Sequence, residues 1–203
     1  MIVFLGDSIT QWWDAEYFNH YFGMYNPVNL GMEGNTTKDT IEYLELSHFN
    51  NLKPSNVVLQ IGTNDGDHDM TTGETAANIG KICSLVFEHS PESKILLVGP
   101  LPRGERVADR HNIYNREVNK LLSVSKFRRD KRITYIDIGC MFLENDKTIS
   151  KNIMYDYLHL TKRGYHILSE TVSEFLFTST QAQILASAPL GVDSSPAPLP
   201  RLS

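Results

Sequence analysis

A serine, an asparagine and an aspartate–histidine pair stand in this chain at turns where catalytic groups are often found. Ser8 and Asn64 each follow a short apolar run, and Asp156 precedes His159 by three residues. That spacing lets a tight turn bring the carboxylate to the imidazole. A serine hydroxyl is a weak nucleophile until a base removes its proton, and a histidine oriented by a carboxylate is such a base. These residue types predict acyl transfer through Ser8, with His159 as the base and Asp156 orienting it.

The same turns offer groups that could stabilise the oxyanion of ester hydrolysis. Preorganised hydrogen-bond donors do this, and the candidates are the Ser8 backbone N–H, the Gly31 backbone N–H and the Asn64 side-chain amide. Each residue taken alone fits a structural role better. Gly-Asp-Ser at residues 6–8 is ordinary turn chemistry, and Ser8 with Gln11 fits a helix capping box. Their joint occurrence at turns favours a catalytic site.

Apolar runs that alternate with helical patterns would position these turns. The predicted strands are residues 2–5, 28–30, 57–61, 95–98 and 133–136. A helical pattern follows each strand, the first over residues 9–21. This alternation predicts a three-layer α/β/α sandwich, a flavodoxin-like doubly wound sheet of five parallel strands in the order 2-1-3-4-5. Such sheets place their ligands outside the carboxyl ends of the strands, where Ser8 and Asn64 would lie.

The chain is expected to form one domain. Apolar periodicity ends near residue 177, so the domain is predicted over residues 1–177, with a disordered, low-complexity tail over residues 178–203. Residues 137–155 show no strong periodicity and predict a long surface loop, which in a compact domain is often functional.

Composition excludes several classes of protein. The formal net charge is -5 and no basic patch stands out, so nucleic acid is not an expected partner. No apolar run approaches about 18 residues, so no membrane span is expected. The five residues before Gly6 are too few for a signal-peptide core, which predicts a cytoplasmic protein. Cys83 and Cys140 lie in apolar patterns and predict buried thiols without a disulfide framework.

A metal site is not expected either. Asp65, Asp67 and Asp69 resemble the opening of a calcium-binding loop. Such a loop needs glycine at its sixth position and glutamate at its twelfth, where this chain has Met70 and Ala76. We therefore expect neither a metal nor another cofactor.

Four sequence blocks together resemble the SGNH (GDSL) hydrolase family. They are Gly6-Asp7-Ser8, the glycine of Asn29-Leu30-Gly31, Gly62-Thr63-Asn64-Asp65 and Asp156-Tyr157-Leu158-His159. Within the family, the chain most resembles the catalytic α subunits of intracellular platelet-activating-factor acetylhydrolases. The segments that carry this similarity are residues 31–37 and 101–105, and Leu158-His159-Leu160-Thr161 followed by Gly164-Tyr165.

The resemblance implies the same fold and a metal-independent serine esterase with a Ser8, His159 and Asp156 triad. It further implies Gly31 and Asn64 as oxyanion donors, a preference for short acyl groups, acetyl above all, and a homodimer.

Two positions depart from those α subunits. Asp65 stands where they usually have asparagine, and Asn35 where they usually have aspartate. The substrate consequently stays open between an acetylated lipid and an acetylated sugar. A carbohydrate O-acetylesterase is the alternative enzyme, because Trp12 or Trp13 could line a cleft beside Ser8 and suit a sugar ring. A non-catalytic, flavodoxin-like binding module is the alternative of another class.

Overall fold

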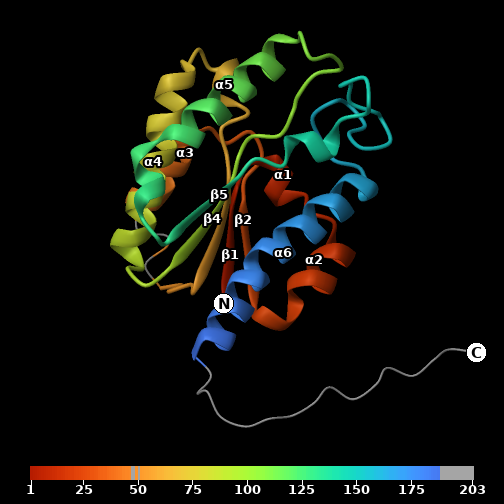
Figure 1. The fold of residues 1–203 in the computed structure, drawn as a ribbon. Helices are drawn as coiled ribbons and strands as arrows, with labels where there is room; N and C mark the ends of the chain where they lie inside the picture. The colour runs from red at the N-terminus through yellow and green to blue at the C-terminus, as the bar shows by residue number, and fades with distance from the viewer. Residues whose placement is uncertain (47–48, 50, 188–203) are drawn as a thin grey trace, which may run out of the picture.

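Five parallel strands form one sheet in the order β2-β1-β3-β4-β5 (Figure 1). The strands are β1 (Ile2–Gly6), β2 (Pro27–Gly31), β3 (Asn56–Gln60), β4 (Lys94–Val98) and β5 (Ile133–Ile136). This computed structural model describes residues 1–46, 49 and 51–187, with the backbone alone for residues 127–128 and 178–187. The predicted α/β fold class and strand order are confirmed.

Helices cover both faces of the sheet. They are α1 (Ser8–Gln11), α2 (Ala15–Phe22), α3 (Thr37–Glu45), α4 (Thr72–His89), α5 (Arg110–Val124) and α6 (Lys162–Ser187). Short 3₁₀ turns are η1 (Gly23–Tyr25), η2 (Asp65–Asp67), η3 (Lys126–Arg129) and η4 (Gly139–Phe142). Figure 1 shows α3, α4 and α5 on one face, α2 and α6 on the other, and α1 at the carboxyl end of β1.

The central strands are apolar because they are buried on both faces. In β1, Ile2 and Phe4 join the core under α2 and α6, whereas Val3 and Leu5 join the core under α3, α4 and α5. A parallel strand covered on both sides reads as a continuous apolar run rather than an alternating one. This is why residues 2–5 could be recognised as a strand.

The register of the sheet aligns the ends of three strands. Gly6 pairs with Gly31 of β2 on one side and with Gln60 of β3 on the other. The turns that follow these strands therefore share one edge. Gly31 is required there because a Cβ at this position would lie 2.1 Å from the backbone nitrogen of Gln11. Helix α1 can thus pack directly against the end of β2.

The predicted single helix over residues 9–21 is wrong, because the chain forms two helices there. Helix α1 ends at Gln11, and α2 begins at Ala15. The Oδ1 atom of Asp14 accepts hydrogen bonds from the backbone of Glu16 and Tyr17, which caps the second helix. The dense aromatic sequence concealed this helix start.

Ser8 is also not the N-cap that the capping-box interpretation expected. The Asp7 carboxylate takes that position and accepts a 2.9 Å hydrogen bond from the Ile9 N–H. Gln11 does not reach back, because its Oε1 accepts a hydrogen bond from the Glu33 N–H. The Ser8 hydroxyl is consequently not used for capping.

The later part of the chain differs from expectation in three places. Helix α6 continues to Ser187, so the expected domain end at residue 177 falls inside a helix, while residues 188–203 lie outside the described residues. The segment 137–155 buries Ile149, Ile153 and Met154 and is thus packed rather than only a surface loop. Cys83 is buried as predicted, but Cys140 is exposed.

Among the helices of the described residues, none combines the length and the apolar character needed to cross a membrane.

Candidate active site

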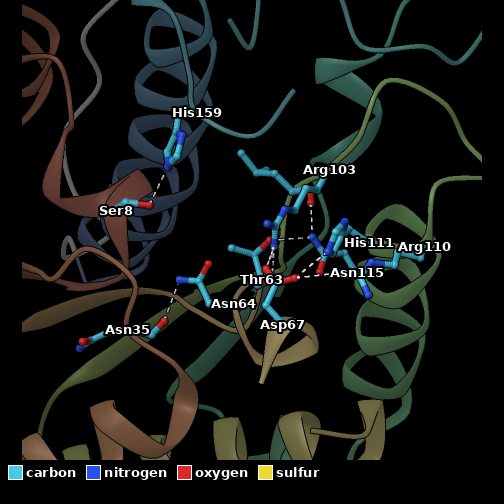
Figure 2. A network of polar contacts seen from close by, with 11 residues as sticks. Ser8, Asn35, Thr63, Asn64, Asp67, Arg103, Arg110, His111, Asn115 and His159 are labelled. Atoms are coloured by element: carbon cyan, nitrogen blue, oxygen red, sulfur yellow. Dashed lines mark hydrogen bonds and ion pairs between the residues drawn. The ribbon is translucent and has the colours of Figure 1, made fainter. Parts of the chain in front are cut away.

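Ser8 lies at the start of α1, just beyond the carboxyl end of β1. The residue is 4% exposed, and its Oγ lies 3.1 Å from the Nε2 of His159. Figure 2 shows the Ser8 side chain directed at the imidazole ring, from an element 151 residues away in the sequence. This distance allows direct transfer of the hydroxyl proton to the ring nitrogen.

Asp156 holds the other side of the His159 ring. Its Oδ2 lies 2.7 Å from Nδ1, while its Oδ1 accepts hydrogen bonds from the backbone N–H groups of Leu158 and His159. Burial alone would raise the pKa of Asp156, but the bonds from the His159 ring and the two N–H groups outweigh it and lower the pKa. The carboxylate therefore stays ionised and faces the ring nitrogen that must carry a proton.

A tight turn gives this pair its geometry. Tyr157 lies within it at φ 65°, in the left-handed region. Residues on both sides are joined by a bridge between Met154 and Leu160, and the Gly104 N–H donates to the Tyr157 carbonyl at 2.9 Å. The turn is thus tied to the neighbouring β4–α5 loop.

The three expected oxyanion donors lie at the same edge of the sheet, but they differ in the hydrogen bonds that they already make. Asn64 Nδ2 donates to the Asn35 carbonyl at 3.0 Å, and a carboxamide nitrogen carries a second N–H. The Ser8 N–H belongs to the first turn of α1, which has no intrahelical acceptor. The Gly31 N–H donates to Asn29 Oδ1 at 2.9 Å, so it could reach an oxyanion only by sharing that bond.

The two tryptophans have different surroundings. Trp12 is 39% exposed, and its ring centroid lies 4.5 Å from that of His159. Trp13 is buried in the core, and its indole N–H donates to Ser169 Oγ at 2.7 Å. Trp12 therefore lies beside the Ser8–His159 pair, whereas Trp13 is a packing residue.

The aspartates after β3 point to separate partners. Asp65 is fully buried and accepts hydrogen bonds from Thr37 and Thr75, whereas Asp67 faces Arg103. Among the described residues, no group of three or more acidic, histidine or cysteine side chains is placed to hold a metal ion.

One further carboxyl group lies under the site. Asp7 is 1% exposed, and burial raises its pKa to about 7; the hydrogen bond from Ile9 opposes this and the nearby Asp65 charge adds to it. The group that caps the helix bearing Ser8 thus titrates near neutral pH.

Reasoning from the sequence missed three residues that support the site. Asn29 bridges the Gly31 N–H and the Thr10 carbonyl, and Arg103 and Asn115 both bind Thr63, which precedes Asn64. For Arg103, the sequence offered two signals: its place in the loop after β4 and its place in residues 101–105, a segment that carries the family resemblance.

The arrangement of serine, histidine and aspartate at the ends of parallel strands agrees with the comparison to known families. A model of the GDSL-like lipase/acylhydrolase family matches residues 4–167. The chain belongs to this family. The predicted class of ester hydrolase is confirmed at the level of the family, whose members are esterases and acylhydrolases.

Curated members of the family are similar over most of this chain. The α2 subunit of platelet-activating factor acetylhydrolase IB from Rattus norvegicus is 33% identical over 176 residues, covering 86% of this chain and 75% of the relative. The human α1 subunit is 33% identical over 165 residues, covering 81% of this chain and 70% of the relative.

Solved structures share the fold. A protein from Streptococcus pneumonia, described as a putative platelet activating factor, has a TM-score of 0.74 and 26% identity, covering 86% of this chain and 83% of that chain. Est24, a carbohydrate acetylesterase from Sinorhizobium meliloti, has a TM-score of 0.65 and 18% identity, covering 87% and 98% of the two chains. At 18% identity, the similarity to Est24 indicates a shared fold alone.

Proposed function

We propose that the chain is a serine esterase that hydrolyses short-chain carboxylic esters, mainly acetyl esters, through Ser8, His159 and Asp156. The observation that carries this proposal is the position of His159 between its two partners. Its Nε2 lies 3.1 Å from Ser8 Oγ, and its Nδ1 lies 2.7 Å from Asp156 Oδ2.

The proposed reaction has two steps. His159 takes the Ser8 proton as Oγ attacks the ester carbonyl, and the tetrahedral intermediate collapses to an acyl-enzyme while the alcohol leaves with the proton from His159. Water then attacks the acyl-enzyme, losing its proton to His159, and the carboxylic acid is released as Ser8 regains a proton. Asp156 stabilises the imidazolium that forms in each step.

In both intermediates, the free N–H of the Asn64 amide and the Ser8 backbone N–H would donate to the oxyanion. Gly31 would contribute a third bond shared with Asn29. Donors that already point at the developing charge lower the barrier because they need not reorganise.

The preference for acetyl esters rests on the relatives, whose names call them acetylhydrolases. The cytoplasmic location and the homodimer also stay predictions. A second candidate function is deacetylation of carbohydrates, because the exposed Trp12 ring beside His159 offers a face for a sugar ring. The non-catalytic alternative is disfavoured, since a mere binding module does not need Ser8 and His159 in hydrogen-bond contact.

Initial rates on p-nitrophenyl esters from acetate to octanoate test the proposal, with Ser8→Ala as the control. We expect the rate to fall steeply beyond acetate or propionate and to disappear in the folded variant. Rates on an acetylated xylose and on an acetylated glycerolipid then separate the two candidate substrate classes. Comparable activity in wild type and Ser8→Ala would contradict Ser8 as the nucleophile.

A further inference from the structure

The turn that carries Asn64 is closed by an arginine from the next crossover. Arg103, in the loop after β4, places its Nη1 atom 3.0 Å from the Thr63 carbonyl oxygen and 2.7 Å from the Asp67 Oδ2. One nitrogen therefore joins the residue before Asn64 to the residue three positions after it. Figure 2 shows this network beside the Ser8–His159 pair.

The guanidinium is itself firmly held. The Arg103 side chain is only 16% exposed. The second oxygen of Asp67 lies 2.7 Å from His111 Nε2 and 3.4 Å from Arg110 Nη2. Burial would raise the pKa of Asp67, but the bonds from His111 and Arg103 and their charges lower it. The ion pair is thus charged, and charge-assisted hydrogen bonds are shorter and stronger than neutral ones.

The contact with Thr63 acts directly on Asn64 through the backbone. The Thr63 carbonyl and the Asn64 nitrogen belong to one planar peptide unit. Fixing the carbonyl oxygen therefore fixes the bond that leads to the Asn64 Cα, from which the amide side chain extends. The preceding Gly62, at φ 117°, provides no such restraint, since glycine has a wide range of backbone conformations.

Other contacts restrain this peptide plane less directly, since the bond that closes the turn, from the Asp65 N–H to the Gly62 carbonyl, is long at 3.4 Å. Asn115 Nδ2 donates to the Thr63 hydroxyl, which can rotate about its own side chain. The Asn64 amide donates to the Asn35 carbonyl, which restrains only the far end of that side chain. Arg103 is the group with a hydrogen bond to the Thr63 carbonyl itself.

We propose that Arg103 is a positioning residue for the oxyanion-binding amide of Asn64, acting through the Thr63 carbonyl without touching the substrate. This inference rests on the proposed function, in which Asn64 donates to the oxyanion. A displacement of a catalytic group by about 1 Å can cost about 100-fold in rate. Removal of Arg103 should therefore lower kcat and leave KM nearly unchanged.

A double-mutant cycle on p-nitrophenyl acetate tests the proposal. Asn64→Ala should lower kcat by about 10²–10³-fold, and Arg103→Ala should lower it by about 10–100-fold. The double variant should be no slower than Asn64→Ala alone, because Arg103 then has no amide to position. Millimolar guanidinium should partly restore kcat in Arg103→Ala but not in the double variant.

Arg110→Ala is the matched control. Arg110 also contacts Asp67, but its side chain is 78% exposed and does not contact Thr63, so kcat should stay at the wild-type value. Arg103→Lys provides a second cycle if Arg103→Ala does not fold, as judged by circular dichroism. Lysine keeps the charge but lacks the planar fork, so its loss should be smaller and should again vanish beside Asn64→Ala.

Several results would overturn the inference. Losses that multiply in the double variant would show that Arg103 acts independently of Asn64. A raised KM with unchanged kcat would show a substrate-binding arginine instead, and wild-type kinetics in Arg103→Ala would remove any role. A wild-type kcat in Asn64→Ala would overturn the oxyanion role of Asn64, and this inference with it. The first three results would overturn the inference but leave the proposed function intact.

Discussion

The carboxylate of Asp156 has two tasks in the proposed mechanism, and both depend on its charge. It fixes the ring of His159 so that Nε2 faces Ser8, and it stabilises the positive charge that the ring acquires. Asp156→Asn keeps the size of the side chain but can present an N–H to the ring, which favours the wrong tautomer.

We expect Asp156→Asn to lower kcat toward the roughly 10⁴-fold loss known for serine triads without their carboxylate. Asp146→Asn is the matched control, because Asp146 accepts similar backbone and hydroxyl bonds in a turn of its own, with Thr148. Steady-state kinetics with both folded variants checks this. A loss below about tenfold for Asp156→Asn would contradict the orienting role.

Some residues of the site could be predicted from the amino-acid sequence, and others could not. Asp156 and His159 could be predicted as a pair because they lie three positions apart in the sequence. Arg103 could not, because its contact with Thr63 spans 40 residues and leaves no periodic pattern. Asp65 stands where the α subunits usually have asparagine, and only the structure explains this difference. Its buried carboxylate accepts hydrogen bonds from Thr37 and Thr75.

At the scale of elements, helix α1 has an unusual cap. The Asp7 carboxyl is buried, and burial raises its pKa from 3.8 to about 7. Between these values the folded protein keeps a proton that the unfolded chain has lost. The stability that this proton contributes is therefore present at low pH and is lost as the pH rises toward about 7.

Asp7→Asn should flatten this part of the pH dependence. Asparagine also caps helices well but does not titrate, so the variant lacks the loss of stability on ionisation. Urea unfolding of both proteins between about pH 5 and 8 measures the difference. We expect the free energy of unfolding of the wild type to fall more steeply with rising pH than that of the variant. Parallel curves would contradict an elevated pKa for Asp7.

The elements were predicted unevenly, for reasons of packing. All five strands were found because a run buried on both faces is apolar at every position. The break between α1 and α2 was missed because Trp12 and Trp13 continue the aromatic pattern across it and conceal the helix-start signal of Asp14 and Glu16. Helix α6 extends past residue 177 because residues 181–187 include good helix formers, although residues 178–203 as a whole have the composition of a low-complexity tail.

On the scale of the whole molecule, the doubly wound topology brings distant segments to one edge. β1 and β3 are neighbours in the centre of the sheet, so Ser8 and Asn64 follow adjacent strands. His159 arrives from the opposite end of the chain, and α6, which follows it, is tied to α1 by a hydrogen bond from the Tyr165 hydroxyl to the Ile9 carbonyl. The strand order could be predicted because right-handed crossovers permit few alternatives. The path that brings the His159 turn to Ser8 could not be predicted from the strand and helix pattern, because residues 137–155 have no repeating pattern.

Covalent labelling tests the central claim, that Ser8 is an activated nucleophile, most directly. A fluorophosphonate reacts with a serine whose proton is removed by a neighbouring base, and mass spectrometry of the labelled protein and its peptides locates the adduct. We predict a single adduct on the peptide that contains Ser8, no adduct in Ser8→Ala and slow labelling in His159→Ala. An adduct on another residue, or no adduct in a wild-type protein that still hydrolyses p-nitrophenyl acetate, would contradict the account.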